Sequence, residues 1–300
     1  MLTRTGDYAQ STRTSQLLLE AQTRSRATQI QISSGKVAQQ FSGIAADASR
    51  LVSAKDALQR IGEFQHNNTL VGQRLEVMES STASLIEIAT GLRVLLIQRL
   101  DSAQGVSGTI SPSVEQMLQQ TASDLNAELD GRYLFAGSRT DRPAVALDPA
   151  FAAFGTPDDT YYQGDAVELT VRADVDHDVS YGMTADREGF QELIGALRAA
   201  AEGDGSDDRA LLESALDLVN AALPKIAGYQ SELGASRAAL ERVNLGHGDA
   251  ELYLESQVSD IENVDLSAAI TRLAQDRMVI ESSMATIAQL NRLSLVDFLR

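Results

Sequence analysis

The sequence predicts a mainly α-helical protein, with long antiparallel helical rods and a coiled coil formed by both termini and a small β-rich insertion in the middle of the chain. Apolar residues recur at alternating spacings of four and three near the C-terminus and through a long central segment, as in helices that pack along a seam. Aromatic residues make up only 5% of the 300 residues and Trp is absent, so the apolar share rests on the aliphatic residues of helix–helix packing. Three of the five prolines and two alternating apolar runs fall in one central segment.

The segment from Asp265 to Arg300 has the most regular helical pattern. Asp265 can accept hydrogen bonds from the first backbone N–H groups, and neither Gly nor Pro interrupts the run that follows. Arg277 occupies a seam position where an apolar residue is expected, and it either fixes register or partner choice or extends its charge to the rim. The chain offers little else to cover this stripe, so we expect an assembly interface on the helix. Its residues are Leu266, Ile270, Leu273, Arg277, Ile280, Met284, Ile287, Leu290, Leu293 and Phe298.

The first forty residues are the expected partner of the C-terminal helix. Residues 1–40 are rich in Thr, Ser, Gln and Arg, and their apolar positions are too sparse to sustain a core. We expect this segment to be poorly ordered alone and to become helical against the C-terminal helix. Leu17 and Ile30 are its expected contributions to the assembly interface.

A second long helix is predicted from about Asp47 to Leu100, where one heptad register continues for several repeats. A helix of about 44 residues would be roughly 66 Å long, which is a rod rather than an element of a compact domain. Gly62, Gly72 and Gly91 within it indicate either close helix packing or a hinge. The expected rod core comprises Ile61, Phe64, Val71, Leu75, Met78, Leu85, Leu92 and Leu96.

Shorter helices are expected on both sides of the insertion. Ser111 as N-cap and Pro112 begin a helix that is expected to run to Asp130 and to end at Gly131. The helices expected after the insertion are residues 190–201, residues 207 to about 245 and residues 250–263, with a break at Gly246-His247-Gly248.

The segment from Arg139 to Asp186 has a different character, because alternating runs at 166–171 and 177–181 predict short strands. It belongs to the acidic part of the chain: 6 basic and 17 acidic residues lie between Arg139 and Glu213. Three domains are predicted. They are an inner terminal coiled-coil domain of residues 1–40 and 265–300, a helical rod domain of residues 41–135 and 187–264, and an outer β-rich insertion domain of residues 136–186.

Composition and spacing give no candidate for catalysis. The formal net charge of −17 argues against nucleic acid as a partner, and the absence of Cys excludes disulfides and thiolate metal sites. No run approaches the roughly 18 apolar residues of a membrane span. His66, His177 and His247 have no metal-ligand spacing and are expected at the surface. The acidic run 174–178 lacks the glycine and the final glutamate of a calcium loop, so neither a metal nor a cofactor is expected.

Both ends of the chain carry short motifs. Those near the N-terminus are Ser33-Ser34-Gly35 and Ala45-Ala46-Asp47-Ala48. Those near the C-terminus are Ile261-Glu262-Asn263-Val264-Asp265, Ala269-Ile270-Thr271-Arg272-Leu273 and Leu293-Ser294-Leu295-Val296-Asp297-Phe298-Leu299. These motifs resemble the flagellin superfamily, although residues 36–41 depart from its commonest pattern. The stretches 131–141 and 161–165 are similar to the FlgL-type hook-associated proteins within it more than to flagellins.

The resemblance implies a subunit with an inner coiled-coil tube domain from both termini, a helical rod and a small outer β domain. It also implies export through the flagellar type III apparatus, with a chaperone on the C-terminal helix before secretion, and a location in the extracellular bacterial flagellum. The implied partners are identical subunits in a ring, another hook-associated protein on the hook side, and flagellin on the filament side.

The resulting hypothesis is a non-catalytic structural adaptor that joins the flagellar hook to the flagellin filament. A flagellin that forms the filament itself is the nearest alternative. A coiled-coil signalling protein is a second one, disfavoured because the β insertion lies at the midpoint of the chain and no membrane span is expected. An enzyme is disfavoured because the sequence offers no catalytic residues.

Overall fold

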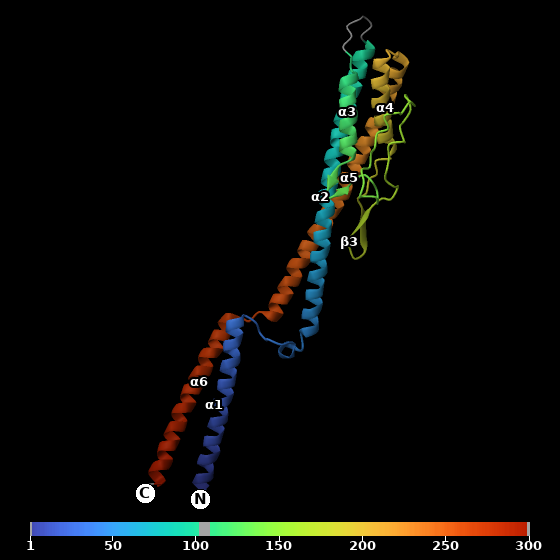
Figure 1. The fold of residues 1–300 in the computed structure, drawn as a ribbon. Helices are drawn as coiled ribbons and strands as arrows, with labels where there is room; N and C mark the ends of the chain where they lie inside the picture. The colour runs from blue at the N-terminus through green and yellow to red at the C-terminus, as the bar shows by residue number, and fades with distance from the viewer. Residues whose placement is uncertain (1, 102–108, 299–300) are drawn as a thin grey trace. The chain divides into compact units, whose positions relative to one another are not determined.

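The computed structural model describes the backbone of residues 2–101 and 109–298, and the side chains of residues 12–101 and 109–289. Within this part, the α-helices are α1 (Leu2–Ser34), α2 (Ala48–Asp101), α3 (Ser111–Leu125), α4 (Glu188–Gly205), α5 (Arg209–Glu262) and α6 (Leu266–Phe298) (Figure 1). A short 3-10 helix, η1, spans Phe41–Ile44. The strands are β1 (Glu128–Leu129), β2 (Arg132–Tyr133), β3 (Thr170–Asp174) and β4 (His177–Ser180). The sequence also predicts a turn at residues 105–110, before Ser111, and most of this segment lies outside the described residues.

The chain divides into two compact units. Unit 1 comprises Met1–Arg60 and Ala250–Arg300, and unit 2 comprises Ile61–Asp249. The predicted mainly α fold class, with both termini paired as helices and a β-rich insertion in the middle, is confirmed. The division into three domains stays a prediction.

In unit 1, α1 and α6 pack as an antiparallel pair, so that the two ends of the chain lie at the same end of the pair (Figure 1). Residues 1–40 therefore do find their helical partner in the C-terminal helix. Asp265 caps α6 as expected, because its Oδ1 accepts a hydrogen bond from the Ala268 backbone N–H at 3.0 Å.

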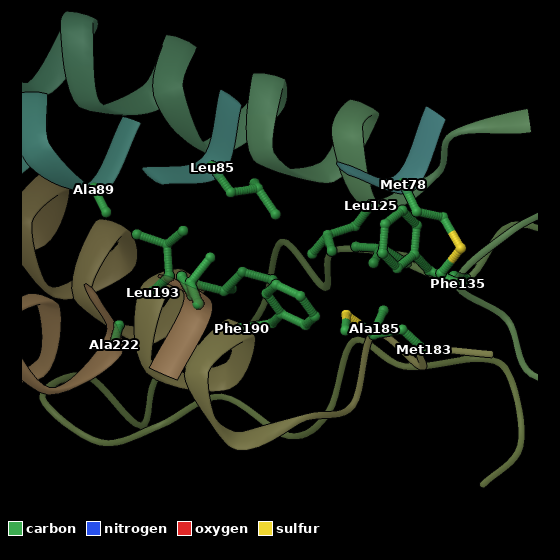
Figure 2. Packing of buried hydrophobic residues seen from close by; sticks show 14 of the residues in the cluster. Met78, Leu85, Ala89, Leu125, Phe135, Met183, Ala185, Phe190, Leu193 and Ala222 are labelled. Atoms are coloured by element: carbon green, nitrogen blue, oxygen red, sulfur yellow. The ribbon is translucent and has the colours of Figure 1, made fainter. Parts of the chain in front are cut away.

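Unit 2 has one apolar core to which four helices and the insertion contribute. Figure 2 shows its packed side chains: Met78, Leu85 and Ala89 of α2, Leu125 of α3, Phe190 and Leu193 of α4, Ala222 of α5, and Phe135, Met183 and Ala185 of the insertion and its flanks. Of the expected rod core, Val71, Leu75, Met78, Leu85, Leu92 and Leu96 are buried, whereas Ile61 and Phe64 are half-buried. The heptad register of α2 therefore faces this core.

The helix after Ser111 is shorter than the sequence predicted. It ends at Leu125, and a tight antiparallel hairpin follows, in which Leu129 pairs with Arg132. Asp130 and Gly131 form its turn with positive φ angles of 53° and 75°, the combination that an Asp-Gly pair favours. The prediction of helix to Asp130 was wrong because Asp130-Gly131 is a hairpin turn rather than a helix terminus. Ser111 is the first helical residue, and Ile110 occupies the N-cap position.

The predicted break at Gly246-His247-Gly248 is also wrong, because α5 continues through it. His247 is buried rather than exposed: its ring stacks on Phe64 with a centroid distance of 5.7 Å, and its Nε2 lies 3.0 Å from the Ala173 carbonyl oxygen. These contacts offset the cost of two helical glycines, about 1 kcal/mol each. They also fix the end of β3 against α5.

The insertion contains little regular strand, since β3 and β4 form its only two-stranded ladder among the described residues. The first strand begins at Thr170, later than the alternating pattern from 166 suggested. Buried polar contacts hold the rest of the insertion in place. The Tyr161 hydroxyl donates to the Ala185 carbonyl oxygen at 2.6 Å, and burial, aided by nearby carboxylates, raises the pKa of Tyr161. Arg198 of α4 pairs with the buried Asp158 at 2.9 Å.

Asp204 near the end of α4 caps α3 from outside that helix. One carboxylate oxygen accepts the backbone N–H groups of Ile110 and Ser111, at 2.7 and 2.9 Å, and the other accepts from Arg99 Nε at 2.7 Å. Burial works to raise the pKa of Asp204, but the hydrogen bonds from Thr109, Arg99 and Ser111 outweigh it and hold the pKa well below its ordinary value. This carboxylate therefore ties the ends of three helices together.

One stretch of α2 is apolar enough, by length and composition alone, to cross a membrane, contrary to the sequence expectation. In unit 2 the apolar face of this helix supplies Leu85, Ala89, Leu92 and Leu96 to the core. Only 28% of this stretch is buried, so packing against the other helices accounts for part of its hydropathy.

We predict that Gly195→Ala destabilises unit 2 by about 1–3 kcal/mol, because a Cβ at this position of α4 would overlap the Thr156 carbonyl oxygen of the insertion. Gly228→Ala in α5 is the matched control, since a Cβ there meets nothing within 4 Å. It should stabilise by about 0.5–1 kcal/mol. Urea unfolding followed by circular dichroism measures both, and equal stability changes in the two variants would contradict the prediction.

Candidate assembly site on the terminal helices

The α1–α6 seam in unit 1 is lined mainly by small residues. Buried positions on α1 are spaced by four and three, at Ala21, Ser25 and Thr28, and those on α6 recur every seven residues, at Ala269, Asp276 and Ser283. The half-buried Leu273, Ile280 and Ile287 each follow one of these α6 positions by four residues. Small side chains let two helix backbones approach closely, but each contributes little apolar area.

The seam that α6 uses toward α1 lies beside the one that the sequence predicted. Both include Leu273, Ile280 and Ile287, but the observed contact adds Ala269, Asp276 and Ser283 in place of the predicted Ile270, Arg277 and Met284. On α6, three positions of the heptad are mainly apolar or small, whereas a seam with one partner helix uses two. Heptad spacing alone could not decide which pair of positions faces α1, because both pairs recur every seven residues.

The unused positions leave an exposed apolar stripe on α6, comprising Leu266, Ile270 and Met284 with Arg277 among them. Ile270 is 57% exposed. On α1, Leu17 and Ile30 are also exposed. Leu290, Leu293 and Phe298 lie outside the residues whose side chains are described. All these positions remain proposed assembly residues.

A short joint links the terminal pair to the ends of α2 and α5. Val264 N–H donates to the Gly35 carbonyl oxygen at 2.9 Å, and Val37 N–H donates to the Glu262 carbonyl oxygen at 2.8 Å. Lys36 and Asn263 thus form an isolated antiparallel bridge. Gly35 has a φ of 72°, which favours glycine as α1 ends. Backbone hydrogen bonds therefore hold the two connectors together.

Glu262 clamps the joint with its side chain. Its carboxylate pairs with Lys55 of α2 and, at 3.7 Å, with Lys36 of the connector. The hydrogen bond from Lys55 is the main cause of a lowered pKa of Glu262, and it outweighs the opposing effect of burial. One carboxylate thus joins the end of α5, the start of α2 and the segment that follows α1.

An open groove of about 630 Å³ lies beside the joint and is lined by Val37, Ile44, Arg50, Asp260 and Ile261, among others. Charges of both signs and half-exposed apolar walls are unlike the enclosed pockets that bind small ligands. Within the described residues, no three His, Asp or Glu side chains lie close enough together to hold a metal ion. The geometry offers surfaces for protein contact.

The ion pair between the exposed Arg24 and the buried Asp276 was not predicted from the sequence. Arg24 Nε lies 3.1 Å from Asp276 Oδ1, and Asp276 is 9% exposed. The sequence did contain a signal, because Asp276 recurs seven residues after Ala269 and seven before Ser283. The apolar residues next to these positions drew the prediction to the neighbouring Arg277.

Paired terminal helices with a second, exposed apolar stripe define a class of helical subunits that assemble through their chain ends. The chain belongs to the flagellin family. The model of the bacterial flagellin N-terminal helical region matches residues 7–140, and that of the C-terminal helical region matches residues 216–299, which together exceed half of the chain. No curated protein matches the chain significantly.

Several solved structures share the fold. FlgL from Bacillus cereus is 18% identical, with a TM-score of 0.58, and the match covers 69% of this chain and 99% of that one. Flagellar hook associated protein-3 from Legionella pneumophila is 14% identical, with a TM-score of 0.59, covering 69% and 98%. The flagellar junction protein FlgL from Legionella pneumophila is 13% identical, with a TM-score of 0.55, covering 71% and 99%.

We predict that Glu262→Gln loosens the joint at neutral pH. Partly exposed ion pairs contribute about 0.5–1 kcal/mol, so hydrogen exchange at the Val37 and Val264 amides should become about two- to fivefold faster. The lowered pKa of Glu262 means that the wild-type clamp is present above its unfolded pKa, near 4.3, and is lost as the pH falls below it through the folded pKa.

The wild type and Glu262→Gln should therefore converge in protection at acid pH. Glu255→Gln is the control, because Glu255 is exposed on the same helix. A pH-independent difference between wild type and Glu262→Gln would show that the charge of this carboxylate is not what holds the joint.

Proposed function

We propose that this protein is the structural adaptor that joins the bacterial flagellar hook to the flagellin filament, assembling through its terminal helices after export. The observation that carries the proposal is the exposed stripe with Ile270 and Met284 on α6, next to a seam already occupied by α1. A helix with one filled and one open apolar face is built to bind a further helix. The names of the similar structures, a junction protein and a hook-associated protein, support the hook–filament position.

The mechanism is folding coupled to assembly. The small-residue seam stabilises the terminal pair only weakly in one subunit, and burial of the exposed stripe by neighbouring subunits supplies the remainder. A weakly folded end can be unfolded for passage through a narrow export channel. The subunit then becomes rigid where it is incorporated.

The proposed partners follow from this mechanism. Identical subunits form a ring, another hook-associated protein contacts it on the hook side, and flagellin contacts it on the filament side. Before secretion, an export chaperone covers the C-terminal helix, whose stripe would otherwise favour premature association. The protein acts outside the cell as part of the flagellum and has no catalytic role.

A flagellin that forms the filament itself is the second candidate, because the matching family models are those of flagellin termini. Addition of purified subunits to filament seeds separates the two. A flagellin elongates the seed without limit, whereas an adaptor adds a short layer and stops. Family membership argues against the coiled-coil signalling alternative.

Deletion of the gene tests the adaptor function directly. We expect electron microscopy of the deletion strain to show hooks without filaments, with unassembled flagellin in the medium. Complementation with the wild-type chain should restore filaments. Normal filaments on the hooks of the deletion strain would refute the adaptor function.

Substitution of the exposed stripe tests its role in assembly. We predict that Ile270→Asp abolishes complementation by the exported protein, because burying a carboxylate without a partner against a neighbouring subunit costs several kcal/mol. Gln275→Asp is the matched control, since Gln275 is exposed on α6 about 140° around the helix from Ile270, on the face opposite the stripe. Equal motility of the two variants would place the assembly interface elsewhere.

A further inference from the structure

Asp276 is the only charged residue among the seam positions that α1 and α6 bury or half-bury against each other within the described side chains. The other positions hold small or aliphatic residues such as Ser25, Thr28, Ala269 and Leu273. The Asp276 side chain is 13% exposed and pairs with Arg24 at 3.1 Å, while Arg24 lies 4.0 Å from Glu20. A charge in this place lowers the apolar area of the seam and requires a partner.

Register within one chain does not need this ion pair. The joint already aligns the two helices, because Val264 N–H bonds to the Gly35 carbonyl oxygen at the end of α1 and the start of α6. The joint therefore fixes the register, but it does not determine which helix packs against the seam of α6. In a crowded assembly of identical chains, α6 meets other copies of α6 as well as α1.

Parallel pairing of α6 with a second α6 through the same seam would be unfavourable. Asp276 would lie opposite its own copy. The nearby arginines of α6, Arg272 and Arg277, lie at exposed positions outside the seam, so two like charges would meet within it.

We infer that the Arg24–Asp276 ion pair selects the partner of the terminal helices: it directs α6 onto α1 and prevents parallel pairing of α6 with another α6. The charge acts as a specificity device at some loss of stability, as polar residues do in coiled-coil seams. The inference concerns which helices pair and does not rest on the position of the protein between hook and filament.

Sedimentation velocity of the purified full-length chain tests this inference with two single substitutions. We expect Asp276→Leu to form dimers through α6, with a dissociation constant at least about tenfold lower than that of the wild type. Ser283→Leu is the matched control, because Ser283 lies one heptad further along the same seam and is also buried. It adds the same apolar side chain while leaving the carboxylate in place, so it should remain as monomeric as the wild type.

Disulfide cross-linking through a cysteine introduced at residue 280 locates the new contact, because the chain has no other cysteine. Asp276→Leu should give an α6–α6 disulfide, and Ser283→Leu should not. Equal dimerisation of the two variants would mean that apolar area, not charge, sets the partner. A wild type that already cross-links through residue 280 would also overturn the inference.

Swapping the charges of Arg24 and Asp276 is the second test of this inference. Asp276→Arg alone places two arginines together, and hydrogen exchange of residues 12–34 should become at least about fivefold faster as α1 detaches. Adding Arg24→Asp should return the exchange to within about twofold of the wild type. Failure of the swap to restore protection would overturn the pairing role. Because none of these measurements involves flagella, their outcome is separate from that of the deletion experiment.

Discussion

The antiparallel packing of α2 on α5 is the constraint on which the rest of the structure depends. In unit 2, Phe64 stacks on His247 and Glu79 pairs with Arg237 at 3.0 Å; in unit 1, Lys55 pairs with Glu262. Within unit 1, the start of α2 thus meets the end of α5. The segments toward the two termini therefore leave the same joint. This is why residues separated by most of the chain can form one helical pair.

The two units are stabilised by different physical means. The core of unit 2 buries large aliphatic and aromatic side chains, and a fully buried side chain of this kind contributes about 1.5–3 kcal/mol. The described α1–α6 seam buries Ala, Ser and Thr, which contribute much less, and it includes a charge. Stability is therefore concentrated in unit 2, and the terminal pair depends on its joint and on whatever covers its exposed stripe.

The sequence predicts what repeats and misses what depends on single tertiary contacts. The heptads of α2 and α6 and the helical pairing of the termini follow from periodicity. The continuous α5 could not be predicted, because Gly246 and Gly248 are tolerated only through the packing of His247 on Phe64. Asp204 gave no local signal, since it caps α3 from a distant helix. On α6, periodicity identified the stripe but not which half of it faces α1.

The two halves of the apolar stripe on α6 carry different kinds of side chain. The half that faces α1 alternates small or charged residues with Leu273 and Ile280, whereas the exposed half adds Ile270 and Met284. Ile270 is 57% exposed and Met284 49%, so covering them would contribute about 0.8–1.5 kcal/mol each, more than Ala269 or Ser283 can contribute inside the subunit. A neighbour can therefore add apolar burial that the small positions of the α1 seam do not provide. Ends that are only marginally folded before incorporation suit the proposed passage through an export channel.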